Sequence, residues 1–265
     1  MIRQVIDIAR GAGKIVMKQY GGTFKINYKK DQFDPVTSVD LESNTYLTKQ
    51  LQKHFPKDQI LSEETKHTVK NYAGRVWVID PIDGTKGFIK KADFSIIIGL
   101  LQDGKPSLGV VYDPVHDVVF YAEKNKGAFM LKNGRVKRLK VRKTKTLPDA
   151  VLVTRFFNQN KWPLDPVVEK MKVRKRIPLH STGLKLAYLA AGKADVVIGT
   201  SPRVSKWDTC GSQVILEEAG GMVTDLSGKP LDYTHKSSEW HYFLASNGFL
   251  HGKVLHEIRR LAPSK

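Results

Sequence analysis

The fold of this chain is decided by residues 76–88, Val76-Trp77-Val78-Ile79-Asp80-Pro81-Ile82-Asp83-Gly84-Thr85-Lys86-Gly87-Phe88. β-Branched and aromatic side chains favour strands, so residues 76–79 predict a buried strand. Pro81 has no backbone N–H to donate, and a central strand is therefore not expected to continue through it. The sequence thus predicts a buried strand that runs directly into a tight turn rich in polar groups.

Two carboxylates lie at the end of this strand, Asp80 and Asp83, three residues apart. Mg²⁺ prefers carboxylate, carbonyl and water oxygens and often shares its ligand shell with a substrate phosphate. Gly84 lets the backbone approach a ligand closely, and the amides of residues 84–86, if they open a helix, form an anion site. The turn therefore indicates a metal and phosphate site, although an Asp-Pro and Asp-Gly turn with a capping aspartate is the alternative.

A second motif lies further along the chain, Lys206-Trp207-Asp208-Thr209-Cys210, followed by Glu218-Ala219-Gly220-Gly221. Together with residues 77–85, it resembles the paired signatures of the Mg²⁺-dependent, lithium-sensitive phosphomonoesterases related to inositol monophosphatase. The resemblance covers essentially the whole chain. Within that superfamily, Lys86-Gly87-Phe88 is more similar to the 3′(2′),5′-bisphosphate nucleotidases, which dephosphorylate 3′-phosphoadenosine 5′-phosphate (PAP), whereas inositol monophosphatases more often have Thr-Asn-Phe.

The resemblance implies a layered αβαβα sandwich, the sugar-phosphatase fold, and the residue pattern agrees with a mixed α+β and α/β class. Apolar periodicity predicts a helix over residues 2–19, and apolar runs between residues 94 and 141 predict antiparallel hairpins. After a basic, turn-rich stretch at 140–148, strand and helix patterns alternate, which is typical of an α/β unit. We therefore expect two halves, residues 1–142 with most of the metal ligands and residues 143–265 with the specificity residues and the last metal ligand.

The resemblance also implies a metal set and a catalytic pair. Asp40 and Thr85 would orient and deprotonate the attacking water. The expected ligands of two or three Mg²⁺ ions are Glu63, Asp80, the Ile82 carbonyl, Asp83 and Asp208.

From the residues alone, the acids outside the turn have simpler explanations. Asp40, or Ser38, is placed to cap the helix that follows it, and Asp208 is placed as the N-cap of a later helix. Glu63 and Glu64 end a short apolar strand, where adjacent residues point to opposite sides, so only one of them is expected to face a given site. The resemblance selects Glu63 for the metal and leaves Glu64 outward or in a supporting position.

The helix predicted over residues 182–191 begins after Ser181, whose simplest role is that of an N-cap. In the resembled nucleotidases a serine and a lysine near this position, spaced Ser-x-x-Lys, contact the phosphates of the nucleotide. This spacing selects Lys185 and places Thr182, not Ser181, at the serine position, so the hydroxyl assignment stays open. The expected substrate contacts are Gly84, Thr85, His180, Ser181, Thr182, Lys185 and Arg203.

The chain of 265 residues carries 44 Lys and Arg against 26 Asp and Glu, a formal net charge of +18. Such a charge attracts nucleic acid or steers a highly anionic substrate, unless it only reflects a Lys-rich composition. No zinc-finger spacing or RNA-recognition aromatic motif is present, so nucleic acid is not expected as the main partner. Cys210 is the single cysteine and no run of about 18 apolar residues occurs, so we expect a cytoplasmic protein without a membrane span. We also expect a monomer or a homodimer.

The predicted activity is Mg²⁺-dependent, lithium-sensitive hydrolysis of PAP to AMP and phosphate. The alternative substrate class is that of an inositol monophosphatase or a broad sugar phosphatase that includes fructose 1,6-bisphosphate, and the compact length of the chain favours it. A non-catalytic nucleotide- or RNA-binding protein is the alternative of another kind. The intact acidic set argues against that alternative.

Overall fold

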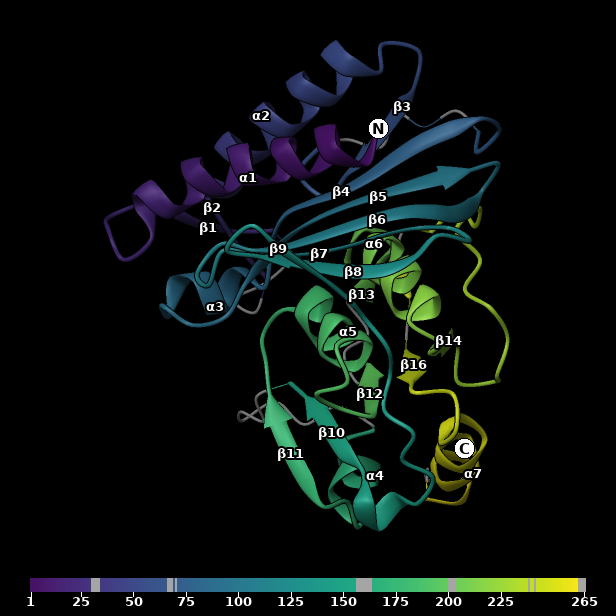
Figure 1. Ribbon diagram of the computed structural model, residues 1–265. Helices are drawn as coiled ribbons and strands as arrows, with labels where there is room; N and C mark the ends of the chain where they lie inside the picture. The colour runs from purple at the N-terminus through teal and green to yellow at the C-terminus, as the bar shows by residue number, and fades with distance from the viewer. Residues whose placement is uncertain are drawn as a thin grey trace.

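Layers of secondary structure alternate through the molecule in the order helices, sheet, helices, sheet, helices (Figure 1). The computed structural model describes residues 1–29, 34–65, 69, 71–155, 164–199, 204–237, 239–240 and 242–261. Over this part of the chain the predicted αβαβα sandwich is confirmed. Its two sheets differ in kind, one mostly antiparallel and one partly parallel, which agrees with the predicted mixed class.

The outer layer on one side consists of α1 (Ile2–Gln19) and α2 (Ser38–His54). The predicted apolar face of α1 is buried, with Val5, Ala9 and Val16 fully inaccessible to solvent. This face packs with α2 and the large sheet in one core cluster. In the described part of the chain, no helix is long and apolar enough to cross a membrane.

The large sheet has the strand order β3-β4-β5-β6-β7-β8-β9 in the residues that the structure describes. β3 and β4 are parallel, and each later pair of neighbours is antiparallel, as the predicted hairpins require. Residues 76–79 are fully buried in β4, which confirms the buried strand. The strands are β3 (Gln59–Ser62), β4 (Arg75–Asp83), β5 (Ser95–Gln102), β6 (Lys105–Asp113), β7 (Val118–Glu123), β8 (Gly127–Lys132) and β9 (Arg135–Arg138).

Two short elements complete the surroundings of the large sheet. A small hairpin, β1 (Ile26–Tyr28) with β2 (Pro35–Thr37), leads from α1 into α2. A short helix, α3 (Thr85–Ile89), follows directly after β4.

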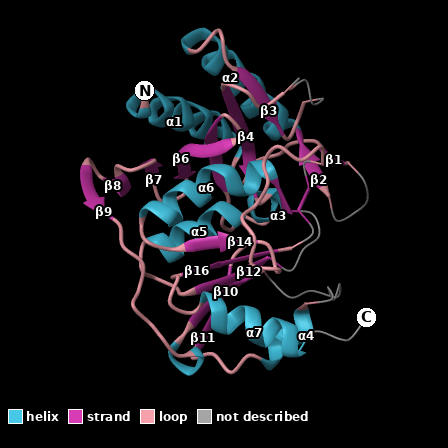
Figure 2. Cartoon of the chain, turned by 90° about the vertical axis from the view of Figure 1, so that its right-hand side faces the viewer, coloured by secondary structure: helices cyan, strands magenta, loops and turns pink. Residues whose placement is uncertain are grey.

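The second sheet has the order β11-β10-β12-β16-β14 within the described residues, and α4 (Asp165–Lys170) and α7 (His251–Leu261) cover its outer face (Figure 2). β11 is not predicted by the sequence, because Lys-Arg-Ile-Pro lacks an apolar pattern. It lies at the sheet edge, where charged residues and proline are tolerated. The remaining elements are η1 (Leu147–Asp149), β10 (Val151–Thr154), β11 (Lys175–Pro178), β12 (Val196–Gly199), β13 (Val204–Ser205), β14 (Met222–Thr224), β15 (Glu239–Trp240) and β16 (Phe243–Ser246).

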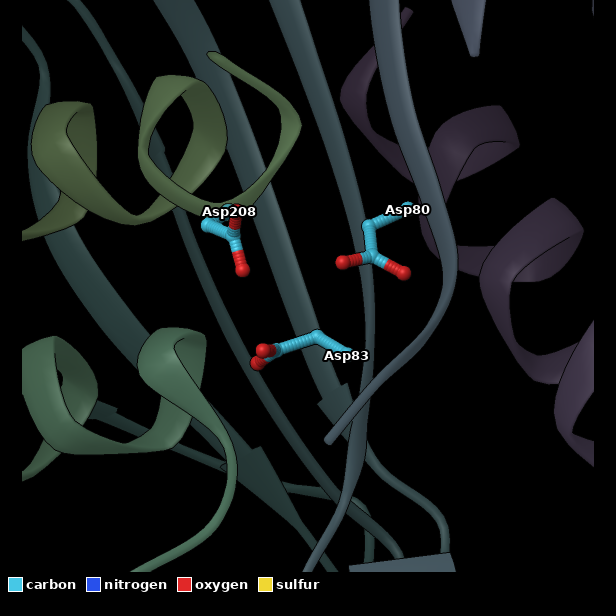
Figure 3. A group of neighbouring side chains, drawn as sticks. All are labelled: Asp80, Asp83 and Asp208. Carbon is cyan, nitrogen blue, oxygen red and sulfur yellow. The ribbon is translucent and has the colours of Figure 1, made fainter. Parts of the chain in front are cut away.

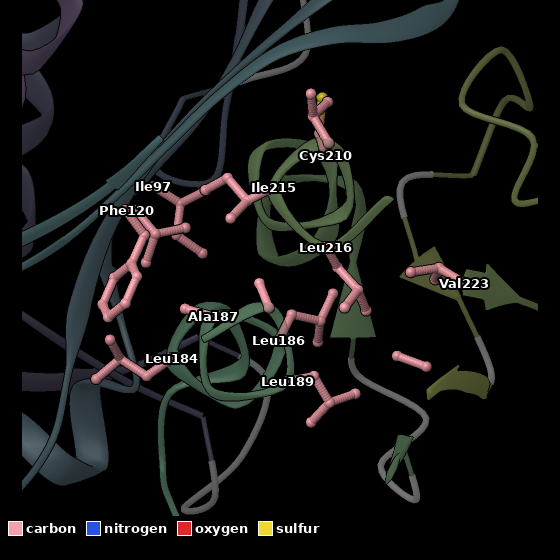
Figure 4. Packing of buried hydrophobic residues seen from close by; sticks show 14 of the residues in the cluster. Ile97, Phe120, Leu184, Leu186, Ala187, Leu189, Cys210, Ile215, Leu216 and Val223 are labelled. Carbon is pink, nitrogen blue, oxygen red and sulfur yellow. The ribbon is translucent and has the colours of Figure 1, made fainter. Parts of the chain in front are cut away.

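The middle layer consists of α5 (Thr182–Ala190) and α6 (Lys206–Glu218), which lie between the two sheets (Figure 2). Figure 4 shows apolar side chains of the large sheet, such as Ile97, on one side of these helices and Val223 of β14 on the other. One core cluster therefore contains residues from both sheets. The boundary between residues 142 and 143 stays a prediction, since this shared core joins the two halves.

Glycines let α6 approach the large sheet closely. A Cβ atom on Gly109 of β6 would lie 1.9 Å from the carbonyl oxygen of Gly211 in α6, and one on Gly99 of β5 would lie 2.6 Å from the Cys210 sulfur. These positions set the depth at which α6 packs. Because Asp208 is in the first turn of α6, they also set the position of the last expected metal ligand.

Replacing Gly109 by alanine is expected to destabilise the protein, because the new methyl group would meet a backbone atom that cannot move without α6. We expect a loss of about 1–3 kcal/mol in the free energy of unfolding, measured by urea denaturation. Gly252→Ala in α7 is the matched control, since a Cβ there meets nothing within 4 Å; its stability should stay equal or rise by up to about 1 kcal/mol. Equal stability of both variants would contradict this account of the packing.

Candidate metal centre and active site

Among the described residues, three acidic side chains converge at one end of the large sheet: Asp80 and Asp83 from β4 and Asp208 from α6 (Figure 3). Each offers one carboxylate oxygen, and these oxygens all lie within 4.8 Å of one another. Asp80 and Asp83 are buried. The two motifs that are far apart in the sequence therefore meet in space.

A bulge at the end of β4 turns both aspartates towards one site. Asp80 pairs with Ile97 of β5 and Asp83 with Ser95, so three steps along β4 correspond to two along β5. The bulge leaves Pro81 outside the ladder, and β4 therefore extends to Asp83 instead of ending at Asp80 as predicted. In a regular strand, residues 80 and 83 would point to opposite faces, because side chains alternate.

Asp83 joins β4 to the start of α5. Among the described residues, its carboxylate accepts hydrogen bonds from the amides of Thr182 (2.9 Å) and Gly183 (2.8 Å) and from the hydroxyls of Ser181 and Ser95. The first amides of a helix have no acceptor within the helix, and a carboxylate is favoured at its positive end. Asp83 therefore fixes where the α5 N-terminus lies relative to the acidic site.

Asp40 and Asp208 occupy the same position in two different helices. Thr37 is the N-cap of α2 and Ser205 that of α6, and each aspartate accepts a hydrogen bond from its N-cap amide, at 2.8 Å and 2.6 Å. Both are capping boxes, in which the third helical residue reaches back to the cap. The predictions of Asp40 or Ser38, and of Asp208, as N-caps are therefore wrong, because the hydroxyl residue before each helix is the cap.

The structure places Asp40 and Thr85 in contact, with Thr85 Oγ1 3.1 Å from Asp40 Oδ1. The same hydroxyl lies 3.2 Å from the Ile82 carbonyl oxygen. Burial raises the pKa of Asp40 to about 6, although hydrogen bonds from Thr37 and Thr85 lower it. A carboxylate with a pKa near the working pH is suited to accept a proton as a general base.

Glu63 and Glu64 both face Lys29. The Lys29 Nζ lies 2.7 Å from Glu63 Oε1 and 2.6 Å from Glu64 Oε1. The premise of alternating strand residues does not hold for them, because β3 ends at Ser62 and the two glutamates follow in a turn; which of them faces the metal stays a prediction. Nor does Glu64 point outward, since its side chain is 5% exposed.

The carboxylates of this site repel one another. Burial raises the pKa of Asp80 well above its usual value, and the charges of Glu63, Asp83 and Asp208, with a hydrogen bond to Glu63, raise it further. The pKa of Asp208 is raised in the same way by burial, Asp83 and Glu63. Carboxylate and carbonyl oxygens are the ligands that Mg²⁺ prefers, so the residues present fit a divalent cation that would neutralise this charge.

Comparison with known proteins agrees with this geometry. The pattern of the inositol monophosphatase family matches residues 1–262. The chain belongs to this family. It is 35% identical over 242 residues to the 3′(2′),5′-bisphosphate nucleotidase CysQ of Salmonella typhimurium, covering 90% of this chain and 96% of that one. It is 33% identical over 257 residues to the fructose-1,6-bisphosphatase/inositol-1-monophosphatase of Thermotoga maritima, covering 97% and 94%.

A solved structure confirms the fold of this inositol monophosphatase family member. A Thermotoga maritima IMPase matches it with a TM-score of 0.85 at 32% identity and covers 98% of both chains. The resemblance of the two sequence motifs to this phosphatase superfamily is thereby confirmed. Proteins of the inositol monophosphatase family use Mg²⁺, and the buried acids of this member could hold it.

The expected substrate contacts gather at the start of α5. Ser181 is the N-cap, and Lys185 is buried one turn further on, with its Nζ 3.4 Å from the carbonyl oxygen of His180. Asp93 holds His180 through its ring, with Nδ1 3.0 Å from Oδ1, and through its backbone amide at 2.7 Å. Arg203 lies outside the described residues.

Gly84 brings the expected phosphate turn against this helix start. Its φ of +90° favours glycine, and a Cβ atom there would lie 3.0 Å from the Ser181 nitrogen. Residues 84–85 and residues 180–185 therefore lie side by side next to the acids. Their roles in binding substrate stay predictions.

Sequence reasoning missed Ser95, Asp93 and Lys29. Ser95 offers a usable signal, because a polar residue at the start of an apolar strand needs a hydrogen-bond partner when it is buried, and here that partner is Asp83. Asp93 and Lys29 lie in polar segments that show neither a hydrophobic periodicity nor a recognisable motif. Their contacts with His180 and with the glutamates arise only when distant segments come together.

Adding Mg²⁺ is expected to raise the melting temperature, because a cation that binds only the folded state relieves the repulsion among buried carboxylates. At about 100 times Kd the shift should be about 5–10 °C, measured by scanning fluorimetry against a sample with EDTA. Asp80→Asn should lose this shift. Without metal it should be at least as stable as the wild type, since one repelling charge is gone and the amide oxygen can still accept from the Ile82 N–H.

Asp195→Asn is the control for this experiment. Asp195 is a buried aspartate away from the acidic site that accepts hydrogen bonds from the Val151 amide (2.8 Å) and the Asn247 side chain (3.2 Å). Its replacement should lower the melting temperature and keep the Mg²⁺ shift. A normal Mg²⁺ shift in Asp80→Asn would contradict the metal centre.

Proposed function

We propose that this member of the inositol monophosphatase family is a Mg²⁺-dependent phosphomonoesterase that converts PAP to AMP and phosphate by removing the 3′-phosphate. The observation that carries the proposal is the burial of Lys185 beside the acidic site. The similarity to the nucleotidase CysQ supports the same substrate.

Lys185 is 8% exposed, and burial lowers its pKa, whereas the charges of Asp83, Asp93 and Asp208 raise it. A buried ammonium group is costly unless opposite charges compensate it, and these three acids do so. Two of them belong to the proposed metal set, so the lysine lies close to where a phosphate would bind. A bisphosphate has a second phosphate group, which a monophosphate lacks, and this second group can bind the Lys185 ammonium. The remaining proposed contacts are His180, Ser181, Thr182 and Arg203.

In the proposed reaction, Thr85 orients a water molecule and Asp40 accepts its proton as the water attacks phosphorus. The bond from phosphorus to the 3′-oxygen breaks, that oxygen takes up a proton from solvent water to become the hydroxyl of AMP, and no phosphoenzyme forms. The amides of Gly84 and Thr85 donate hydrogen bonds to the phosphate as charge develops. Two or three Mg²⁺ ions, when bound, would supply Lewis-acid chemistry, and we expect Li⁺ to inhibit the reaction. The proposed ligands of Mg²⁺ are Glu63, Asp80, the Ile82 carbonyl, Asp83 and Asp208.

An inositol monophosphatase or a broad sugar phosphatase is the second candidate. The Thermotoga maritima relative, named for fructose-1,6-bisphosphatase and inositol-1-monophosphatase activity, is nearly as similar as CysQ and covers more of this chain. This candidate uses the same acids and the same water, and differs only in what Lys185 and its neighbours contact. A non-catalytic nucleotide-binding protein is less well supported, because Asp40 and Thr85 are in contact next to an intact acidic set. Location in the cytoplasm and the monomeric or dimeric state stay predictions.

Asp40→Asn is expected to lower kcat by about 10²–10⁴-fold with little change in KM, because the amide cannot accept the proton. Thr85→Val should also lower kcat because it removes the hydroxyl, whereas Thr85→Ser should retain most activity because it keeps the hydroxyl. Phosphate release with Mg²⁺ measures these rates. Thr45→Val is the control, since its hydroxyl bonds only the Leu41 carbonyl among the described residues and it lies on the exposed side of α2. Wild-type rates in Asp40→Asn would exclude it as the base.

The substrate is tested by comparing phosphate release from PAP, inositol 1-phosphate and fructose 1,6-bisphosphate, with and without Li⁺. We expect PAP to be strongly preferred. Lys185→Met should raise KM for PAP by about tenfold or more, the cost of one charged hydrogen bond, and leave inositol 1-phosphate unaffected. Lys193→Met, an exposed lysine just after the same helix, is the control. Equal turnover of all three substrates would still agree with the proposed metal-dependent mechanism but would contradict the assignment of PAP as the preferred substrate.

A further inference from the structure

The positive charge of this chain is concentrated in one segment. Between Lys124 and Pro148 the sequence has ten Lys and Arg residues and no Asp or Glu. This segment contains β8, β9 and the connection that leads to the second sheet, which passes down the front of the molecule in Figure 1 and along its left-hand side in Figure 2. We name its exposed cations the basic strip: Lys132, Arg135, Lys137, Arg138, Lys140, Lys143 and Lys145.

The backbone of the strip presents these cations outward. All four residues of β9 are exposed, and beyond it Leu139 is buried while Lys140, Lys143 and Lys145 are exposed. Every second residue of an extended chain lies about 6.6 Å further along on the same side. Arg135 and Lys137 therefore share a side, as Lys143 and Lys145 do further on, and the cations are spread along the segment and not gathered in a compact cluster.

Most cations of the strip are not neutralised by the protein. In the described part of the chain, Lys132, Arg135, Lys137, Lys140 and Lys143 have no carboxylate within ion-pair distance. By contrast, Arg142 from the same segment is half-buried and pairs with Asp195 at 3.4 Å. Arg142 thus forms an ion pair within the protein, whereas the neighbouring cations of the connection are exposed to solvent.

An exposed aromatic ring lies at the far end of the strip. Phe249 is 49% exposed, and the Lys145 Nζ lies 5.9 Å from the centre of its ring. Lys253 adds a further cation there, since its Nζ lies 2.7 Å from the Lys145 carbonyl oxygen. A hollow of about 470 Å³ opens beside them, between residues 146–148 and the start of α7.

Protection of the sheet edge explains only part of this arrangement. Charged residues on an edge strand prevent pairing with another sheet, and β9 is the edge of the large sheet. That reason does not apply to Lys140, Lys143 and Lys145, which follow the strand and belong to no sheet. Steering of the small substrate does not account for the strip either, because β9 is separated from β4 by four intervening strands, about 24 Å at 4.8 Å per step.

We infer that the basic strip and Phe249 form a binding surface for single-stranded nucleic acid. Proteins that bind single strands combine a line of cations along the phosphate backbone with an aromatic ring on which a base stacks, over about 4–16 nucleotides. The strip supplies the first part and Phe249 the second. A flexible single strand can follow the strip where it leaves the sheet, and its unpaired bases can stack on the ring, whereas the bases of a duplex are paired and stacked with one another.

The test is fluorescence anisotropy of labelled oligonucleotides of about 16 nucleotides, oligo(U) and oligo(dT), titrated with full-length protein at several salt concentrations. The variant Arg135→Ala/Lys137→Ala/Lys140→Ala/Lys143→Ala should weaken binding at least tenfold. It should also reduce the slope of log K against log salt by about 3, as expected for four lost phosphate contacts to a single strand. Phe249→Ala should weaken binding by about fivefold or more without changing the slope, because stacking releases no counterions.

A matched variant, Lys14→Ala/Lys49→Ala/Lys53→Ala/Lys57→Ala, removes the same charge from exposed positions on and after α1 and α2. Its affinity should remain within about twofold of the wild type. Equal weakening by both quadruple variants would show that net charge alone attracts the strand, and would overturn the inference. Binding to vesicles with anionic lipid but not to either oligonucleotide would overturn it in favour of a membrane surface.

Discussion

The hydrogen bonds that Asp83 accepts from the start of α5 decide where the rest of the site can lie. Asp83 belongs to the large sheet, and α5 belongs to the layer between the sheets, so this contact fixes one against the other. Backbone amides and hydroxyls compensate the charge of this carboxylate inside the protein. A buried acid can therefore hold its position before any metal neutralises it.

Two further acids of the site are positioned by helix starts. Asp40 and Asp208 each complete a capping box, so the bond that begins the helix also fixes the side chain. The same residues then carry a local structural role and a position in the site. Placing acids together in this way is unfavourable, because Glu63, Asp83 and Asp208 raise the pKa of Asp80, and Asp83 and Glu63 raise that of Asp208, so the surrounding core must offset their repulsion. The site is thus a region where the fold accepts lower stability.

The parts of this structure that sequence reasoning predicts are those with a dense local signal. The apolar period of α1, the buried run before Asp80, the hairpins and the two acidic motifs each lie within a short stretch, and the structure brings those motifs together. The predictions were wrong or incomplete where contacts between distant segments, and not the local sequence, determine the structure. The bulge carries β4 past Pro81, the turn after β3 brings Glu64 back to Lys29, and β11 forms only because β10 is beside it.

The middle layer has a consequence for how the chain is made. The last strand of the large sheet ends at Arg138, but α6, which covers one face of that sheet, ends at Glu218. About 80 residues must still be synthesised in between, which takes about 4–16 s at ribosomal speed. Until α5 and then α6 have been made, Ile97 and Phe120 lack the helices that cover them in the folded protein, and the nascent chain carries an open apolar face. The protein therefore depends on its later half to keep its earlier half from aggregating, and an interrupted translation product would be a substrate for chaperones.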